Sequence, residues 1–290
     1  MIKDSIEYLI KTATNPPYSN NVLAARQEYQ KYVGNIFDDD KSYENQMALF
    51  LEWYIFDRID PAHDQTVLEL IINNGKGATL DLLKNINAFI SHIHGLFIIK
   101  KIKDHSVKAI NLFDNKQYDV VEPSGKFYFS KNSIFEGRLL TYENSYYFTG
   151  NFCIHPEGSK KFIKSEIKKI LSAQEINLKK LKLQNIKLKD ENKKLNKTIS
   201  CIEKLQGEIQ GLDSEKKIFK IKNDLSELEP IKKKQEEDYS LLKQNINTFT
   251  HEKIICESQL IQSRLMLKLS SMRLLLERSR NIDLKDIYKN

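Results

Sequence analysis

The amino-acid sequence predicts an α+β protein with an N-terminal helical subdomain, a small antiparallel β-barrel of SH3-like or OB-like type, and a long antiparallel coiled-coil hairpin. Two observations indicate this division. Of the 28 aromatic residues, 23 lie before residue 157. The 132 residues after Gly158 contain one proline, Pro230, and two glycines, Gly207 and Gly211. Few aromatic and helix-breaking residues among many Lys, Glu, Leu and Ile are typical of a coiled coil.

Residues 1–94 are expected to form the helical subdomain. Apolar residues at helical spacing predict helices over 3–13, 22–33, 43–57, about 67–73 and 80–91. Thr66 and Glu69 form a capping-box pattern, in which the Thr hydroxyl accepts from a free amide and the Glu carboxylate accepts from the backbone of the Thr. A helix is therefore expected to begin directly after Thr66.

Residues 95–156 are expected to form the barrel. They are rich in β-branched and aromatic residues, and turn residues divide them into strands over 95–103, 106–113, 117–122, 126–130, 134–141, 145–149 and 151–154. Short strands in so small a module favour a closed barrel, because a flat sheet would leave unprotected edges. Lys126–Phe129 would carry aromatic side chains on both faces of a strand. These aromatics could stack on nucleic-acid bases, but packing in the core is the favoured interpretation.

Part of the helical subdomain and the barrel resembles a group of uncharacterised bacterial proteins. The resemblance rests on an EWxxFDR…TxLE signature, here Glu52-Trp53, Phe56-Asp57-Arg58, Thr66 and Leu68-Glu69, and extends into the barrel at Phe135-Glu136-Gly137-Arg138-Leu139. It covers about residues 43–156 and implies an architecture without catalytic residues. Trp53, Asp57 and Arg58 could mark a recognition pocket. The favoured interpretation is an ion pair at the helix end, covered by a buried Trp53.

The sequence shows no pattern of an enzyme, a cofactor site or a metal site. It contains no Gly-rich phosphate loop, nucleophile elbow or HExxH motif. His92 and His94 would need strand geometry and a carboxylate to bind a metal, and the cysteines Cys153, Cys201 and Cys256 have unrelated spacings. No catalytic residue, cofactor or metal is therefore expected.

No membrane segment or secretion signal is visible in the sequence. Uninterrupted apolar runs such as Leu96–Ile99 are far shorter than the ~20 residues that span a bilayer. Acidic residues interrupt the N-terminus before an apolar stretch can form. A cytoplasmic protein without a membrane partner is expected.

The C-terminal half is expected to be an outgoing helix over 157–206, a tip with a short helix over 207–230, a returning helix over 231–282 and a tail over 283–290. A new helix would begin near Asp213 or Ser214 and stop or kink at Pro230. Heptad spacing predicts seam positions at Leu181, Asn185, Leu188, Asn192, Leu195, Ile202 and Ile209 on the outgoing helix, and at Ile246, Phe249, Leu260 and Leu267 on the returning helix.

Two pairings of these helices are possible. Their near-equal lengths favour an intramolecular antiparallel hairpin, whereas the Asn residues on the seam suit a parallel homodimer. The returning helix also carries an apolar stripe too wide for a two-helix contact, so either the globular part or a second protomer must cover it. Some self-association is therefore expected, and residues 1–156 are expected to fold alone.

The outgoing helix is strongly basic. Residues 160–200 contain 13 lysines and four acidic residues, whereas residues 1–155 contain 16 basic and 19 acidic residues. Candidate phosphate contacts are Lys179, Lys180, Lys182, Lys187, Lys189 and Lys193. The favoured function is a non-enzymatic adaptor or scaffold that binds a protein partner of unknown identity and self-associates through its coil. The alternative is an RNA- or ribosome-associated protein that uses this helix and the barrel.

Overall fold

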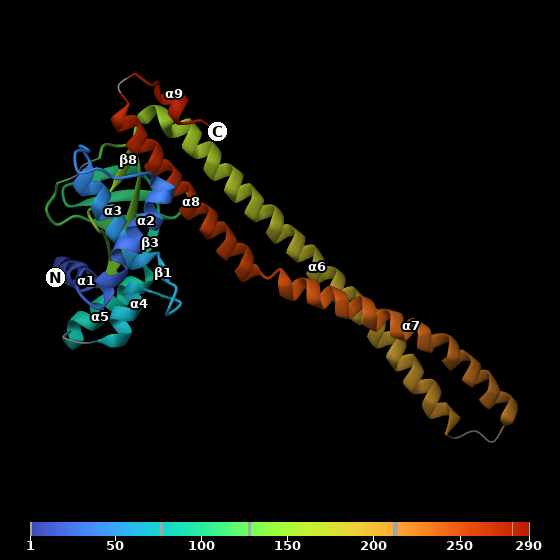
Figure 1. Ribbon diagram of the computed structural model, residues 1–290. Helices are drawn as coiled ribbons and strands as arrows, with labels where there is room; N and C mark the ends of the chain where they lie inside the picture. The colour runs from blue at the N-terminus through green and yellow to red at the C-terminus, as the bar shows by residue number, and fades with distance from the viewer. Residues whose placement is uncertain (1, 76–77, 127–128, 211–213, 280, 290) are drawn as a thin grey trace. The chain divides into compact units, whose positions relative to one another are not determined.

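The computed structural model describes residues 2–75, 78–126, 129–210, 214–279 and 281–289. It confirms the mixed α+β class, with N-terminal helices, a closed β-barrel and long C-terminal helices (Figure 1). The chain divides into two compact units. Unit 1 comprises Met1–Lys169 and Leu260–Asn290, and unit 2 comprises Ile170–Gln259.

Unit 1 begins with the predicted helices. They are α1 (Ile2–Ala13), α2 (Val22–Val33), α3 (Tyr43–Phe56), α4 (Val67–Asn74) and α5 (Leu80–Ala88), with the 3-10 helices η1 (Tyr18–Asn21) and η2 (Phe89–Ser91). Their apolar faces share one core, in which Leu9, Phe50, Tyr54 and Ile86 are almost completely buried. A small hairpin of β1 (Ile59–Asp60) and β2 (Gln65–Thr66) precedes α4 and was not expected from the sequence.

The capping box at Thr66 is confirmed. The Glu69 amide donates to the Thr66 hydroxyl at 3.2 Å, and the Thr66 amide donates to the Glu69 carboxylate at 2.7 Å. Two amide donors at the start of α4 are thereby satisfied. The helix ends at Gly75, whose left-handed conformation (φ 57°) lets its amide bond to the Ile71 carbonyl.

The barrel is built from β3 (Ile93–Lys103), β4 (Ser106–Asn111), β5 (Gln117–Val121), β6 (Ile134–Tyr142), β7 (Ser145–Phe148) and β8 (Cys153–His155). The strand order is β3-β4-β5-β7-β6-β8, and a further pairing of β3 with β6 closes a ring of five strands. β5 and β7 pair in parallel, so the prediction of an all-antiparallel barrel is wrong at this point. Parallel pairing arises because the strand that follows β6 returns between β5 and β6.

The barrel interior is aromatic. Phe97, Tyr118, Phe135 and Phe148 pack together, and Phe129 stacks on Phe135 with ring centroids 4.8 Å apart. The strand predicted over 126–130 is absent at its described residues, Lys126, Phe129 and Ser130, whereas Phe127 and Tyr128 lie outside the described residues. Most of the described aromatic side chains of the barrel therefore form core, while Tyr142 and Tyr147 pair with each other outside this cluster, with ring centroids 6.0 Å apart.

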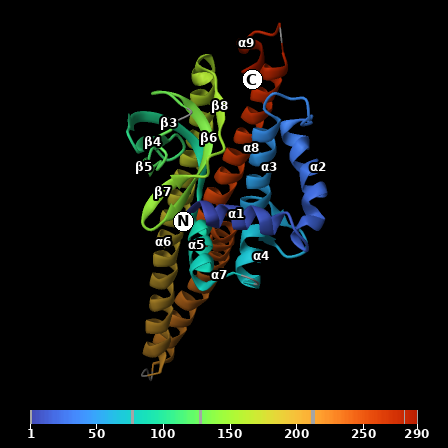
Figure 2. The ribbon, with the colours of Figure 1, turned by 90° about the vertical axis from the view of Figure 1, so that its left-hand side faces the viewer.

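The C-terminal segment of the chain completes unit 1. From residue 260 onward α8 (His251–Arg278) belongs to this unit, together with the start of α6 (Lys160–Ile209), the 3-10 helix η3 (Glu157–Ser159) and α9 (Leu284–Ile287). In Figure 2 this part of α8 runs between the barrel strands and α3. Leu274 is buried in the helical core, and the Arg273 guanidinium donates to the Ile154 carbonyl at 3.1 Å. Much of the wide apolar stripe is covered in this way, since Leu265, Met266 and Leu269 are also buried.

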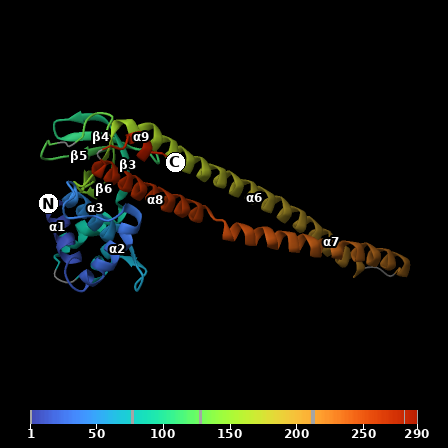
Figure 3. The same cartoon turned by 45° about the horizontal axis from the view of Figure 1, so that its top comes forward.

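Unit 2 consists of α6 from residue 170 onward, α7 (Glu215–Thr248) and the first turns of α8. α6 and α7 lie side by side in Figures 1 and 3. α7 continues through Pro230, where a stop or kink was predicted, and the helix break falls at residues 249–250 instead. Pro230 is exposed, so the carbonyl that loses its helical donor can bond to water. Ser214 is the N-cap of α7, while Gly211 and Asp213 lie outside the described residues.

Within the described part of the chain, no helix combines the length and the apolar character needed to cross a bilayer.

Candidate functional site

A network of buried charged side chains joins α3 to the barrel. Its centre is Arg138 on β6, which is 1% exposed. The guanidinium donates through Nη1 to Asp57 Oδ1 at 3.1 Å and through Nη2 to Asp57 Oδ2, and it lies over the Phe56 ring, 4.7 Å from the centroid. Asp57 directly follows the last residue of α3, so this bidentate pair fixes the end of the helix on the barrel wall.

His94 lies between two carboxylates of the same network. Its Nδ1 is 3.4 Å from Asp57 Oδ2, and its Nε2 is 3.0 Å from Glu136 Oε1. The register of β3 with β6 places His94 opposite Arg138, two residues along the strand from Glu136. The other oxygen of Glu136 accepts from the Ser270 hydroxyl on α8 at 2.9 Å. The network therefore connects α3, two barrel strands and α8.

The two neighbouring histidines respond in opposite ways to this environment. Burial and the Arg138 guanidinium oppose protonation of His94, but Asp57 and Glu136 outweigh them and raise its pKa to about 9. Burial lowers the pKa of His92, which bonds through Nδ1 to the Phe89 carbonyl at 3.0 Å. His94 thus carries a positive charge at neutral pH and His92 does not.

Glu52 lies at the edge of this network. Its Oε1 accepts from the Asn151 amide at 2.8 Å, and its Oε2 is 3.6 Å from Arg138 Nε. Burial raises the pKa of Glu52 despite the nearby guanidinium. A small cavity of about 70 Å³ borders this carboxyl, and its walls come mostly from apolar side chains of α1 and α3.

Both histidines of the network contact carboxylates. His94 lies between Asp57 and Glu136, while His92 precedes β3, bonds to the Phe89 carbonyl and lies 3.7 Å from Asp57 Oδ1. Among the residues that the structure describes, no group of three or more His, Cys, Asp or Glu side chains is arranged to hold a metal.

The ion pair predicted between Asp57 and Arg58 is not formed. Asp57 pairs with Arg138, and Arg58 Nε donates to Glu28 on α2 at 2.8 Å. Trp53 is only partly buried and packs on Tyr29, with ring centroids 5.3 Å apart. The two charges diverge because Arg58 lies beyond the helix end, where the chain turns into β1.

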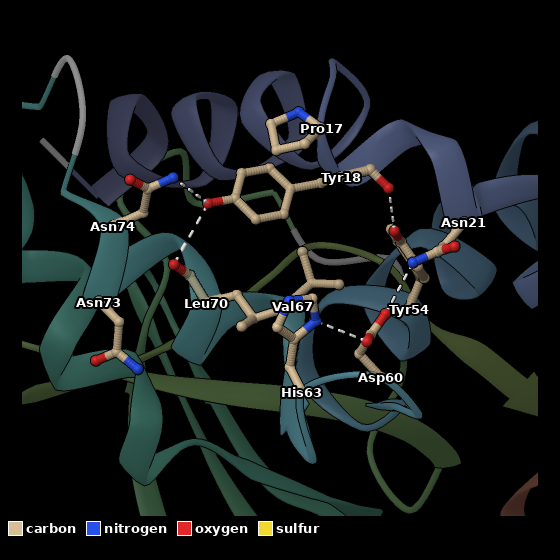
Figure 4. A pocket seen from close by; sticks show the side chains of 10 residues that line it. All are labelled: Pro17, Tyr18, Asn21, Tyr54, Asp60, His63, Val67, Leu70, Asn73 and Asn74. Atoms are coloured by element: carbon tan, nitrogen blue, oxygen red, sulfur yellow. Dashed lines mark hydrogen bonds and ion pairs between the residues drawn. The ribbon is translucent and has the colours of Figure 1, made fainter.

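A larger pocket, of about 390 Å³, lies elsewhere in unit 1 (Figure 4). It is lined by Pro17, Tyr18, Asn21, Tyr54, Asp60, His63, Val67, Leu70, Asn73 and Asn74. Asp60 is 3% exposed, and its carboxylate accepts from the Asn21 amide at 2.8 Å and contacts His63 Nδ1 at 2.9 Å. Burial opposes ionisation of Asp60, but the bonds from His63 and the Ala62 amide outweigh it and lower its pKa. Sequence reasoning missed this pocket because its lining comes from several separate segments.

The residues predicted to form the helix seam differ in burial in the structure. Leu181, Leu195 and Ile202 are buried, which agrees with the heptad. Leu188, Ile209, Asn185, Ile246, Phe249 and Leu267 are partly buried. Asn192 is exposed, and Leu260 is 52% exposed. In the part of α8 that belongs to unit 2, the buried positions are Ile254 and Ser258.

All six lysines proposed as phosphate contacts are exposed: Lys179, Lys180, Lys182, Lys187, Lys189 and Lys193. The Lys179 ammonium pairs with Glu175 at 2.7 Å across one turn of α6. The other five have no resolved ion pair within the described residues, so most of this charge faces solvent.

A family model for a family of unknown function, DUF7986, matches residues 18–194. This range is more than half of the chain. The chain belongs to the DUF7986 family. The match agrees with the resemblance to an uncharacterised group, and it contains every network residue described above except Ser270. Comparison with curated proteins and with solved structures found no match.

Between pH 6.5 and 8.5 the free energy of unfolding of unit 1 is expected to fall. The pKa of His94 is about 9 in the folded chain and about 6.5 in an unfolded one. The contribution of protonated His94 to the free energy of unfolding is therefore complete below pH 6.5. As the pH rises toward 9, this contribution falls by about 2–3 kcal/mol. Urea unfolding at several pH values measures this slope. His94→Gln should flatten it, and an equal slope in both proteins would show that another group titrates.

Proposed function

We propose that this DUF7986 protein is a non-enzymatic adaptor whose unit 2 binds an acidic helical segment of another protein. The observation that carries the proposal is a row of exposed aliphatic side chains on α6. Ile176, Leu183 and Ile186 are 53%, 60% and 48% exposed. Their spacings of seven and three residues place them on one face of the helix, as in a surface that receives a partner helix.

This face lies opposite the buried side of α6. At 100° per residue, Leu183 projects about 160° away from Leu181, which is buried. We propose that the buried side pairs with the chain that returns from α7, in an antiparallel coiled-coil hairpin. The hydrogen bond from the Ser258 hydroxyl to Gln174, at 2.7 Å, and the burial of Ile254 support this pairing. The aliphatic row is then left for a partner.

Lysines surround the aliphatic row. Lys179, Lys180 and Lys187 project within about 60° of Ile176 or Leu183 around the helix axis. A partner helix with Leu or Ile at matching positions and Glu or Asp beside them would bury the aliphatic groups and pair with the ammonium groups. Charge complementarity of this kind favours an acidic partner.

The same observation separates the adaptor from the alternative of RNA binding. A phosphate backbone pairs with lysines but gains little from exposed Ile and Leu side chains. Most of the described aromatic residues of the barrel, among them Phe97, Phe135 and Phe148, pack in its interior, where they are not available to stack on bases. The nucleic-acid alternative therefore depends mainly on the lysines.

A synthetic acidic amphipathic helix and a single-stranded RNA distinguish the two functions. In one variant Ile176, Leu183 and Ile186 are changed to Gln, and in another Lys179, Lys180 and Lys187 are changed to Gln. We expect the peptide to bind and both variants to weaken it at least tenfold. A matched control changes Lys232, Lys233 and Lys234 of α7, which alters the net charge equally, and should leave binding intact.

RNA binding at physiological salt that the lysine variant abolishes and the aliphatic variant leaves unchanged would replace the adaptor with the alternative. A log–log salt slope of about −0.7 per phosphate contact would accompany it. Sedimentation of the same samples tests self-association through the coil, which stays a prediction.

A further inference from the structure

We infer that the pocket in Figure 4 binds a neutral planar heteroaromatic molecule, such as the base of a nucleoside, without its phosphate. Its volume of about 390 Å³ lies in the range of small-molecule sites. All of its lining residues belong to unit 1, and the proposed partner surface lies on α6 in unit 2, so the inference is independent of the proposed function.

The walls of the pocket provide flat and apolar surfaces. Pro17 and Tyr18 lie on one side, with Val67 and Leu70 across from them (Figure 4). Hydrogen bonds hold Tyr18 at its side chain and at its backbone. The Tyr18 hydroxyl donates to the Leu70 carbonyl at 3.3 Å and accepts from the Asn74 amide at 3.1 Å. The backbone carbonyl of Tyr18 accepts from the Tyr54 hydroxyl at 2.5 Å. A fixed aromatic ring is a suitable surface for stacking on another planar ring.

The polar groups of the pocket suit the edge of a base. Asn21, Asn73 and Asn74 each carry one acceptor oxygen and a donor amide, the combination that pairs in two places with a nucleobase edge. The bonds from Asn21 to Asp60, from Asn74 to Tyr18 and from Asn73 to Gln65 restrain these amides. The orientation of these side-chain amides is thereby fixed before a ligand binds.

The charge of the described pocket lining favours a neutral ligand over an anion. Among the described lining residues there is no Lys or Arg. Asp60, the one acidic group among the lining residues that the structure describes, is buried and bonds to Asn21, His63 and the Ala62 amide. A phosphate would meet a buried carboxylate, and no lysine or arginine among the described lining residues would offset the repulsion. His63 Nδ1 faces Asp60, so Nε2 is the ring nitrogen available to a ligand.

Isothermal titration of the full chain with adenosine, guanosine, cytidine and uridine tests the inference. We expect saturable binding of at least one nucleoside and at least tenfold weaker binding of its 5′-monophosphate. A short oligonucleotide of the same base distinguishes a free nucleoside from a base presented by RNA. Tyr18→Ala and Asn73→Ala should each reduce binding at least tenfold.

Asn87→Ala, on the exposed surface of α5 and outside the pocket lining, is the matched control and should bind as the wild type does. Because Tyr18→Ala removes two hydrogen bonds, the fold of this variant is checked by circular dichroism. If the Tyr18→Ala variant is unfolded, the comparison of Asn73→Ala with the wild type decides the test. The inference is overturned if no nucleoside binds at millimolar concentration, if the monophosphate binds more tightly, or if Asn73→Ala and Asn87→Ala bind equally.

Discussion

Replacement of Arg138 by Met is expected to destabilise unit 1 by about 3–5 kcal/mol, the usual cost of breaking a buried ion pair. Arg138 is the only arginine among the described residues of the network, and it pairs with both oxygens of Asp57 while lying 3.6 Å from Glu52. Without it, His94 alone must balance the buried carboxylates. Urea unfolding followed by the fluorescence of the single tryptophan, Trp53, measures the change.

Arg58→Met is the matched control. Arg58 is also buried, but its partner Glu28 is 42% exposed, so water can solvate the carboxylate that remains. Arg58→Met should therefore cost less than Arg138→Met. Adding Asp57→Asn to Arg138→Met should recover part of the loss, because one uncompensated charge is removed. If the two single variants lose equal stability, the network is no more important than a peripheral pair.

Residues 1–156 alone are expected not to fold, in contrast to the expectation from the sequence. Unit 1 includes Leu260–Asn290, and Leu274 is buried in the helical core. Removing Leu265, Met266, Leu269 and Leu274 takes four buried side chains from this unit. At about 1.5–3 kcal/mol each, their loss matches the total stability of a typical domain, about 5–15 kcal/mol.

A shortened variant that retains the C-terminal part of α8 is the comparison. This variant joins residues 1–169 to residues 260–290 through a flexible Gly/Ser linker of about 12 residues, which reaches about 20 Å. We expect this protein to give a dispersed NMR spectrum and to resist limited proteolysis. A folded 1–156 fragment of equal stability would show that the C-terminal helix is dispensable.

The sequence was sufficient for elements that depend on local signals. The capping box at Thr66 and the β-branched and aromatic composition of the barrel segments are short-range patterns. The helix after Thr66 and the barrel strands, except the one predicted over 126–130, formed close to the predicted residues. The pairing of β5 with β7 was not accessible, because hydrogen-bond partners between distant strands leave no mark on local spacing. The helix through Pro230 was missed because exposure, which makes the lost bond tolerable, is a property of the folded chain.

The candidate site was only partly accessible from the sequence. Glu136 and Arg138 are part of the quoted barrel motif. Their role could not be predicted, because it depends on their burial and on the pairing of Arg138 with Asp57, 81 positions away in the sequence. One signal was present: β6 carries two opposite charges in an otherwise apolar strand, and its first seven residues are buried. Charged residues in such a strand indicate buried partners from other elements.

The division of unit 1 across the sequence has a consequence for its synthesis. The segment that completes this unit is translated after the 90 residues from 170 to 259. At about 5–20 residues per second, synthesis of these residues takes roughly 5–20 s. Throughout this time the core of unit 1 lacks the Leu274 side chain. During that interval the apolar surface that α8 later covers is open to solvent and to other chains. The length of unit 2 therefore sets how long the newly made protein needs protection from aggregation.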